Sequence, residues 1–297
     1  MAHANKGSSR ENLIKNKKME KLIYPCVWCN NNALEMANFY ISVFPNTEIV
    51  DQNKWVVVLK MKSQRIMFLN GGDIFKPNPS ISLMYLSSSE QEIESIFKKI
   101  SSNGKKLMPL DSYPFSSKYA WVEDRYNVSW QLITASQDDI IQTVVPTLMF
   151  IGKNNGKAEE AIDFYTSVFA NSHKRGISRY TGNEGETKGN IQHAEFIRNN
   201  YLLMIMDSSY PHAFGFTGGV SIVVECKNQD EVDYYWSKLT SDGGEEDMCG
   251  WLRDKYGVSW QITPAIMKDI LLKSPKVMEV MMTMKKLEIK PLIDAAN

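Results

Sequence analysis

A long internal repeat constrains the fold of this chain more than any other feature. Residues 121–131 read WVEDRYNVSWQ, and residues 251–261, at an offset of 130, read WLRDKYGVSWQ. Seven of these eleven positions are identical, including both tryptophans. The segment FYISVF near the start of the first half recurs as FYTSVF in the second. Such self-similarity indicates a tandem duplication, with copies at 22–134 and 143–264.

Each copy carries the same expected order of secondary structure. The segment EQEIESIFKKI has apolar residues at i, i+3, i+4 and i+7, which predicts a helix, and the second copy repeats the pattern. Ser89 and Asn228 are placed to cap these two helices, with Glu92 and Glu231 as capping carboxylates. Short apolar runs predict strands, so each copy reads βαβββ followed by βαβββ. We therefore expect an α+β fold of two tandem domains, in which paired βαβββ modules form a cup-shaped mixed sheet with outer helices.

Composition and charge exclude several functional classes. The chain has 297 residues, with 34 Lys and Arg, 34 Asp and Glu, and a formal net charge of zero. This balance argues against nucleic-acid binding, which needs clustered basic residues. No apolar run approaches the ~18 residues of a membrane span. Four cysteines do not make a disulfide framework in a chain of this length, and no secretory signal is recognisable, so we expect a cytoplasmic protein.

The two ends of the chain differ from the repeats. Residues 1–21 are mostly polar and basic, and we expect them to be a disordered extension. Residues 265–297 are helical in pattern, with a break at Ser274 and Pro275 and a methionine-rich apolar stripe. We expect this tail to pack on a domain or on a partner chain.

Several segments together carry a resemblance to a known family: PTLMFIG, AEEAIDFYTSVF, HAEF, GVSIVVEC, DEVDYYWSKL, CGWLRDKYGVSWQITP and MEVMMTMKKLEI. The sequence resembles the PhnB-like branch of the vicinal oxygen chelate superfamily, which includes glyoxalases, bleomycin-resistance proteins and extradiol dioxygenases. Members of this branch are often labelled 3-demethylubiquinone-9 3-methyltransferase-like. The sequence does not support methyl transfer, because no strand is followed by the GxGxG turn of Rossmann-like methyltransferases.

The resemblance also implies where a metal would bind. Enzymes of the superfamily hold a divalent metal with His, Gln and Glu side chains. Here the usual glutamate position of the last strand is glutamine in both copies, and each domain keeps at most one credible oxygen ligand. We therefore expect no metal and no other cofactor, with a divalent metal as the alternative. The family positions fall on Gln131 and Gln261, near Pro25 or Cys26, near Pro146 or Thr147, near Met67 and Met204, near Ile81 or Ser82, and near Val220 or Ser221.

The VSWQ strands are the first candidate for a binding site. Ser129 and Gln131 share one strand face, as do Ser259 and Gln261, and the resemblance turns that face into the cup. Thr147 holds a first-strand position of the same site. Uncharged polar groups in a cavity suit hydrogen bonding to a small neutral organic ligand. The alternative is that these strands have a structural role only, in which the intervening tryptophans are core residues and the glutamines hydrogen-bond to backbone groups.

A second candidate site is the pair His193 and Glu195, which lie i, i+2 on an expected strand. They could act as an acid–base or metal-ligand pair, whereas the first copy has Val56 and Val58 there. The loop before His193 is longer than its counterpart and carries four glycines, which is typical of a lid but also of an idle loop. If one domain has a function, these features favour the second.

Three functional classes follow from the sequence. We expect a protein that binds a small organic molecule in its cup, with no nucleic-acid or membrane partner. The alternatives are a lyase, isomerase or dioxygenase with a rebuilt metal site in the second domain, and an assembly protein that recruits a partner through its tail. The sequence leaves open whether the domains pair within one chain or in a homodimer.

Overall fold

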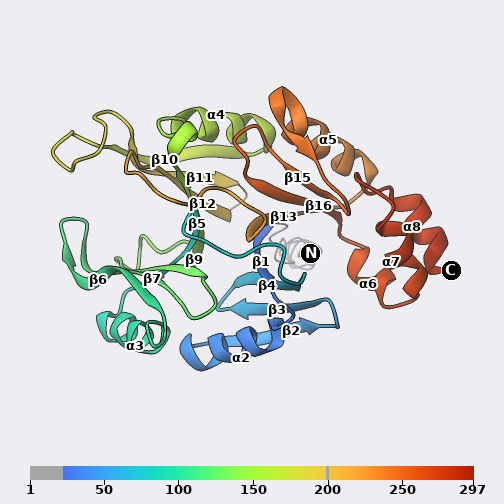
Figure 1. Ribbon diagram of the computed structural model, residues 1–297, viewed down its shortest axis with the longest axis horizontal. Coiled ribbons are helices and arrows are strands. Elements are labelled where there is room, and N and C mark those ends of the chain that lie inside the picture. The colour runs from blue at the N-terminus through green and yellow to red at the C-terminus, as the bar shows by residue number, and fades with distance from the viewer. Residues whose placement is uncertain (1–22, 199–200) are drawn as a thin grey trace, which may run out of the picture.

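The protein contains two eight-stranded mixed sheets with helices on the outside. The computed structural model describes residues 23–198 and 201–297, so the expectation for residues 1–21 lies outside the described residues. In Figure 1, helices α2 and α3 lie along one side of the molecule and helices α4 and α5 along the opposite side, with the strands between them. The fold class expected from the sequence is confirmed.

Sheet A combines the first four strands of the chain with the last four. Its strand order is β14-β15-β16-β13-β1-β4-β3-β2. The two halves meet where β1 pairs antiparallel with β13, whereas β1 with β4 and β13 with β16 are parallel pairs. The strands are β1 (Ile23–Cys29), β2 (Thr47–Gln52), β3 (Val56–Met61), β4 (Gln64–Asn70), β13 (Val220–Cys226), β14 (Glu245–Glu246), β15 (Trp251–Arg253) and β16 (Ser259–Pro264).

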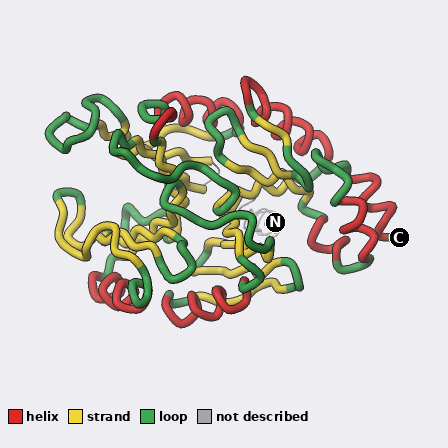
Figure 2. Tube along the Cα trace, in the orientation of Figure 1, coloured by secondary structure: helices red, strands yellow, loops and turns green. Residues whose placement is uncertain are grey.

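Sheet B consists of the eight strands between these two groups. Its order is β10-β11-β12-β9-β5-β8-β7-β6, with the antiparallel pair β5 and β9 at its centre. The strands are β5 (Ile81–Ser87), β6 (Lys105–Tyr113), β7 (Ser116–Glu123), β8 (Ser129–Thr134), β9 (Val144–Phe150), β10 (Ser172–Arg179), β11 (Ile191–Arg198) and β12 (Tyr201–Asp207). Figure 2 shows these strands as the yellow interior of the molecule, with the red helices outside them.

Each sheet therefore takes one βαβββ module from each repeat. The first repeat contributes β1–β4 to sheet A and β5–β8 to sheet B, and the second contributes β9–β12 to sheet B and β13–β16 to sheet A. The modules thus pair within this chain, but across the two repeats. The sequence predicted that the two modules of one repeat form a cup together, whereas the strand orders join modules of different repeats in each sheet.

The hydrophobic cores follow the repeats rather than the sheets. One core packs Tyr40, Phe68 and Trp130 of the first repeat together, and the corresponding core contains Tyr165 and Trp260 of the second. Each repeat supplies most of its own core, to which the other repeat adds Ile23 and Ile81 in one case and Val144 in the other. The helices are α2 (Ala33–Val43), α3 (Glu90–Ile100), α4 (Ala158–Val168) and α5 (Gln229–Thr240), with short 3-10 turns at Gly152–Asn154 and Ser241–Gly243.

The repeated sequence motif stabilises each core through a buried aspartate. Asp124 Oδ1 accepts hydrogen bonds from the backbone N–H groups of Tyr126 and Val128, at 2.8 and 3.0 Å. Its Oδ2 accepts from the Tyr40 hydroxyl at 2.6 Å and from Trp130 Nε1 at 3.1 Å. Tyr40 is the tyrosine of FYISVF, so the two repeated segments bond to each other. Asp254 makes the same four bonds in the second repeat, with Tyr256, Val258, Tyr165 and Trp260.

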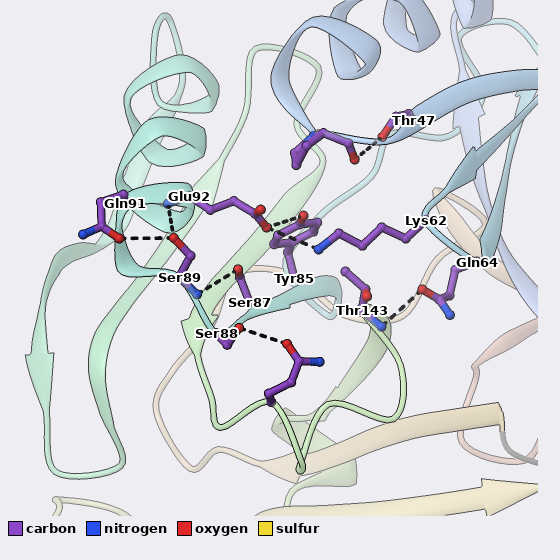
Figure 3. Close-up of polar contacts among 12 residues, drawn as sticks. Thr47, Lys62, Gln64, Tyr85, Ser87, Ser88, Ser89, Gln91, Glu92 and Thr143 are labelled. Carbon is purple, nitrogen blue, oxygen red and sulfur yellow. Dashed lines mark hydrogen bonds and ion pairs between the residues drawn. The ribbon is translucent and has the colours of Figure 1, made fainter.

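The predicted N-cap residues are confirmed, but the predicted capping carboxylates bond elsewhere: the Ser89 N–H donates to Ser87 Oγ at 3.2 Å, and Glu231 Oε2 accepts from the Lys227 N–H at 2.9 Å. Ser89 Oγ accepts from the backbone N–H of Glu92 at 3.2 Å, and Asn228 Oδ1 accepts from that of Glu231 at 2.9 Å. Figure 3 shows that Glu92 also accepts the hydroxyl of Tyr85, at 2.8 Å from Oε1. These contacts fix the start of α3 against the end of β5.

The C-terminal tail forms three short helices that pack on one another. They are α6 (Met267–Leu271), α7 (Pro275–Met281) and α8 (Ile289–Ala296), and Ser274 caps α7 as the break at Ser274 and Pro275 predicts. Backbone bonds from Cys249 and Gly250 to the carbonyls of Met284 and Lys285, both 2.7 Å, attach the tail beside β15. The tail therefore packs on the domain, at the end of the molecule marked C in Figure 1.

Candidate functional site

Sheet A holds a cavity on the face that points away from its helices α2 and α5. We call this face cup A, and the corresponding face of sheet B cup B. The cavity in cup A has a volume of about 780 Å³. Aliphatic side chains make up half of its lining, including Val56, Val58, Met67 and Val223 from the strands and Met267 from α6, and the rest of the lining is polar or charged. It is large enough for a small organic molecule.

Four side chains meet at the centre of cup A, at the positions to which the resemblance assigns the superfamily's metal ligands. Cys26 pairs in register with Ser221 on one side and with Met67 on the other. Gln261, from β16, donates from Nε2 to Ser221 Oγ at 2.9 Å. Gln261 and Met67 line the cavity, whereas Cys26 is completely buried beneath it.

The corresponding four positions in cup B are Thr147, Met204, Ser82 and Gln131, related by the same strand pairings. Gln131 Nε2 donates to Ser82 Oγ at 2.7 Å, as Gln261 does to Ser221. Its Oε1, however, accepts the hydroxyl of Tyr119 at 2.7 Å. Both ends of the Gln131 side chain are thus bonded within the protein.

Cup B has apolar side chains at three positions where the side chains of cup A are polar. In cup A, the Tyr24 hydroxyl donates to Glu225 Oε1 at 2.7 Å, and Arg65 Nη1 lies 3.4 Å from Glu225 Oε2. The strand registers place Val145, Leu202 and Leu86 at the corresponding positions of cup B. These three belong to a cluster that covers the face of sheet B. The cluster comprises Met84, Leu86, Val145, Ile197, Leu202 and Met204, with Ile133, Ala135 and Ile140 packed against it.

Burial changes the acidity of two groups in cup A. It raises the pKa of the Cys26 thiol to about 12. It also raises the pKa of Tyr24 well above its usual value, and the neighbouring Glu225 carboxylate adds to this rise. Both groups therefore stay protonated at neutral pH, so the Tyr24 hydroxyl remains a donor.

The tail helix α6 borders the mouth of the cavity. Met267, Lys268 and Leu271 of α6 line it, and Lys268 Nζ lies 3.1 Å from Asp51 Oδ2 at the end of β2. This ion pair joins the tail to the far edge strand of sheet A. Figure 1 shows α6 at the end of the molecule where β2, β3 and β16 also lie.

The donor set at the centre of either cup does not fit a divalent metal of the superfamily type. Cup A offers a protonated thiol, a thioether, a hydroxyl and an amide, and cup B offers two hydroxyls, a thioether and an amide. Neither set contains the imidazole or carboxylate ligands that Zn²⁺, Fe²⁺ or Mn²⁺ need. Within the described ranges, three or more His, Cys, Asp or Glu side chains do not gather anywhere in a metal-binding group.

Of the five ligand-binding residues expected from the sequence, Gln261 lines the cavity. Gln131 lies in the other cup and is 4 % exposed. Thr147 is buried on the central strand β9 of sheet B, and Ser259 is buried on β16 of sheet A. Ser129 is buried under Trp121, whose Nε1 donates to its Oγ at 2.7 Å. The structure therefore does not bring the five together in one site.

His193 and Glu195 lie side by side on β11, on the face of cup B. His193 Nε2 is 3.5 Å from Glu195 Oε1, and Arg175 Nε is 3.3 Å from Glu195 Oε2. Ile197, two residues further along the same face, packs into the apolar cluster of cup B. The pair thus belongs to a group of ion pairs on sheet B, whereas the described cavity lies on sheet A.

The long glycine-containing loop between β10 and β11 is attached to the protein by Glu186. Its Oε1 accepts the Ser208 hydroxyl at 2.6 Å, and its Oε2 accepts the backbone N–H and the hydroxyl of Ser209, both at 2.5 Å. The loop belongs to sheet B, and none of its residues lines the cavity in cup A.

Sequence reasoning missed the polar group formed by Tyr24, Arg65 and Glu225. These residues lie on three different strands, and Tyr24 and Glu225 are 201 positions apart. A signal was present in the sequence: at three equivalent strand positions, one module has a polar residue where its counterpart has an apolar one. Such a comparison pairs Tyr24 with Val145, Arg65 with Leu202 and Glu225 with Leu86, but it needs the strand registers.

Comparison with solved structures identifies the class of fold. Glyoxalase I from Zea mays is 12% identical, with a TM-score of 0.55, over 84% of this chain and 93% of that one. The PhnB protein from Bacillus cereus is 32% identical, with a TM-score of 0.35, over 38% of this chain and 98% of that one. The paired βαβββ modules are those of the glyoxalase-type vicinal oxygen chelate fold.

The family follows from the sequence match. A model of the 3-demethylubiquinone-9 3-methyltransferase family, the PhnB-like family, matches residues 21–133 and again residues 142–263. The chain belongs to this family and carries two copies of its domain. A comparison with curated proteins finds no match. No helix in the described part of the chain is long and apolar enough to span a membrane.

Proposed function

We propose that this PhnB-like protein binds a small, largely apolar and neutral organic molecule in cup A. The observation that carries the proposal is the cavity of about 780 Å³ with the uncharged Gln261 side chain on its wall. The aliphatic walls would hold the body of the ligand, and Gln261 would orient its polar group. We also propose that binding requires no metal, since the four central side chains of cup A do not suit one.

Charge around the cavity favours a neutral ligand. Arg65 is paired with Glu225, Lys268 with Asp51 and Lys60 with Glu48, the last at 3.0 Å. Each lysine or arginine of the cavity wall thus has a carboxylate beside it. An anionic or cationic ligand would have to compete with these pairs.

Fluorescence of a neutral apolar probe, N-phenyl-1-naphthylamine, tests the proposal. We expect enhancement that saturates at one probe per chain. The double variant Val56→Trp/Val58→Trp, which places two indoles on the cavity wall, should weaken binding at least fivefold. Ile74→Trp is the matched control, because Ile74 is exposed and lies outside the cavity lining. Unchanged probe binding in the double variant would place the site elsewhere.

Metal analysis tests the second part of the proposal. Protein purified without chelator should hold less than about 0.1 equivalent of Ni, Zn, Fe or Mn, because the central donors are neutral. Stoichiometric metal that resists dialysis would contradict a metal-free site and favour the enzyme alternative.

A further inference from the structure

The two cups differ in one hydrogen bond at their centres. In cup B, the hydroxyl of Tyr119 donates to Gln131 Oε1 at 2.7 Å. In cup A, Gln261 makes the equivalent amide bond to Ser221 Oγ, but no described residue donates a hydrogen bond to its Oε1. Gln261 is 9 % exposed and lines the cavity. Cup A thus presents an acceptor that cup B satisfies internally.

The missing donor has a sequence counterpart. The repeat offset of 130 that relates Trp121 to Trp251 places Cys249 at the position of Tyr119. The backbone of Cys249 turns away from the sheet with a φ of 61°, and its N–H bonds to the Met284 carbonyl in the tail. Its Sγ contacts Met282 Sδ at 3.6 Å. Cup A therefore lacks both the phenol ring and the hydroxyl that fill this place in cup B.

We propose that the ligand of cup A is a neutral hydroxyl-bearing compound, a phenol in particular, whose O–H donates to Gln261 Oε1. The ligand hydroxyl would make the bond that the Tyr119 hydroxyl makes in cup B, and its ring or apolar body would lie against the aliphatic walls. This inference rests on the proposed function, since it specifies the ligand of the same cavity.

The polarity of the site explains why a hydroxyl suits it better than an anion or a pure hydrocarbon. A carbonyl oxygen accepts hydrogen bonds and repels a carboxylate, and the Glu225 carboxylate also lies in the cavity wall. A hydrocarbon would cover Gln261 Oε1 without bonding to it, which leaves an acceptor desolvated and unpaired. A hydroxyl avoids both costs.

Three naphthalenes of similar size separate these effects: 2-naphthol donates a hydrogen bond, 2-methoxynaphthalene only accepts one, and 2-methylnaphthalene does neither. We expect calorimetric titration of the full chain to show 2-naphthol binding at least fivefold more tightly than the other two. Gln261→Met removes the acceptor, so it should abolish this preference and tighten the binding of 2-methylnaphthalene, which then no longer covers an unpaired oxygen. Gln261→Glu keeps an acceptor and should retain the preference.

The control variant is Gln131→Met, which alters the same position in cup B and should leave all three affinities unchanged. Equal binding of 2-naphthol and 2-methoxynaphthalene by the unaltered protein would overturn the inference while leaving an apolar binding site in place. A 2-naphthol preference that survives Gln261→Met would also overturn it. Failure of all three compounds to bind would contradict the proposed function itself.

Discussion

Cup A and cup B have the same strand pairings and the same central glutamine, yet cup A borders a cavity whereas a buried apolar cluster lies on the face of cup B. Cup A has the polar group Tyr24, Arg65 and Glu225 where cup B has valine and two leucines. Gln131 is bonded at both ends of its amide, whereas none of the described residues donates a hydrogen bond to Gln261 Oε1. The difference shows that the same strand pairings accommodate polar or apolar side chains on the cup face, while the two large cores lie on the opposite faces of the sheets.

The position of the tail adds to this difference. Helix α6 follows β16 directly and borders cup A, whereas the residues that follow β8 lead into the cluster of cup B through Ala135 and Ile140. The segment after the last strand of each repeat thus borders the cavity of cup A in one case and packs against the apolar cluster of cup B in the other.

The largest expected effect on stability comes from the buried aspartate that both repeats contain. Asp254→Ala leaves two backbone N–H groups, a tyrosine hydroxyl and an indole N–H without their buried acceptor. We expect a loss of about 3–5 kcal/mol of unfolding free energy, measured by urea denaturation. Asp124→Ala should cost about the same, and the exposed Asp138→Ala less than about 0.5 kcal/mol. A small effect in one repeat alone would show that the two frames are not equivalent.

The next effect tests the polar group of cup A. Glu225→Leu removes the carboxylate that faces Tyr24 and Arg65, and we expect it to destabilise the protein by about 2 kcal/mol. The triple variant Tyr24→Val/Arg65→Leu/Glu225→Leu copies cup B and should return to within about 1 kcal/mol of the original. Urea denaturation compares the two variants. If the triple variant is less stable than Glu225→Leu, cup A cannot accommodate the apolar side chains that cup B has at these positions.

A smaller effect distinguishes the two central glutamines. Gln131→Met leaves the buried Tyr119 hydroxyl and Ser82 without partners, so we expect a loss of about 2 kcal/mol. Gln261→Met breaks one bond, to Ser221, and should cost about 1 kcal/mol or less. Thermal unfolding of the two variants under the same conditions measures the difference. The reverse order of stability would contradict the assignment of an open acceptor to Gln261.

The smallest effect is at the mouth of the cavity. The Lys268 side chain is 56% exposed, so its ion pair with Asp51 is largely screened by solvent. Lys268→Ala should change the unfolding free energy by less than about 0.5 kcal/mol. A loss above about 1 kcal/mol in urea denaturation would mean that the tail depends on this contact rather than on its backbone bonds beside β15.

Much of the fold could be predicted because its signals are local. Ser89 and Asn228 were correctly identified as helix caps, since a cap needs only the residues three positions further on. The βαβββ order followed from apolar spacing and from the recurrence of FYxSVF and VSWQ. The site was harder to predict: the repeated motif marks Gln261, which lines the cavity, but Ser259 on the same strand face is buried, and Ser129 and Thr147 are buried in sheet B.

The sequence by itself determined the duplication, the order of the elements and the neutral glutamine at the centre of each cup. The tertiary structure alone decided which modules share a sheet and which side chains surround the cavity of cup A. Those outcomes depend on contacts between distant segments, such as Tyr24 with Glu225 and Cys249 with the tail. Local periodicity fixes which face of a strand is apolar, but only packing across the sheet decides whether that face encloses a cavity.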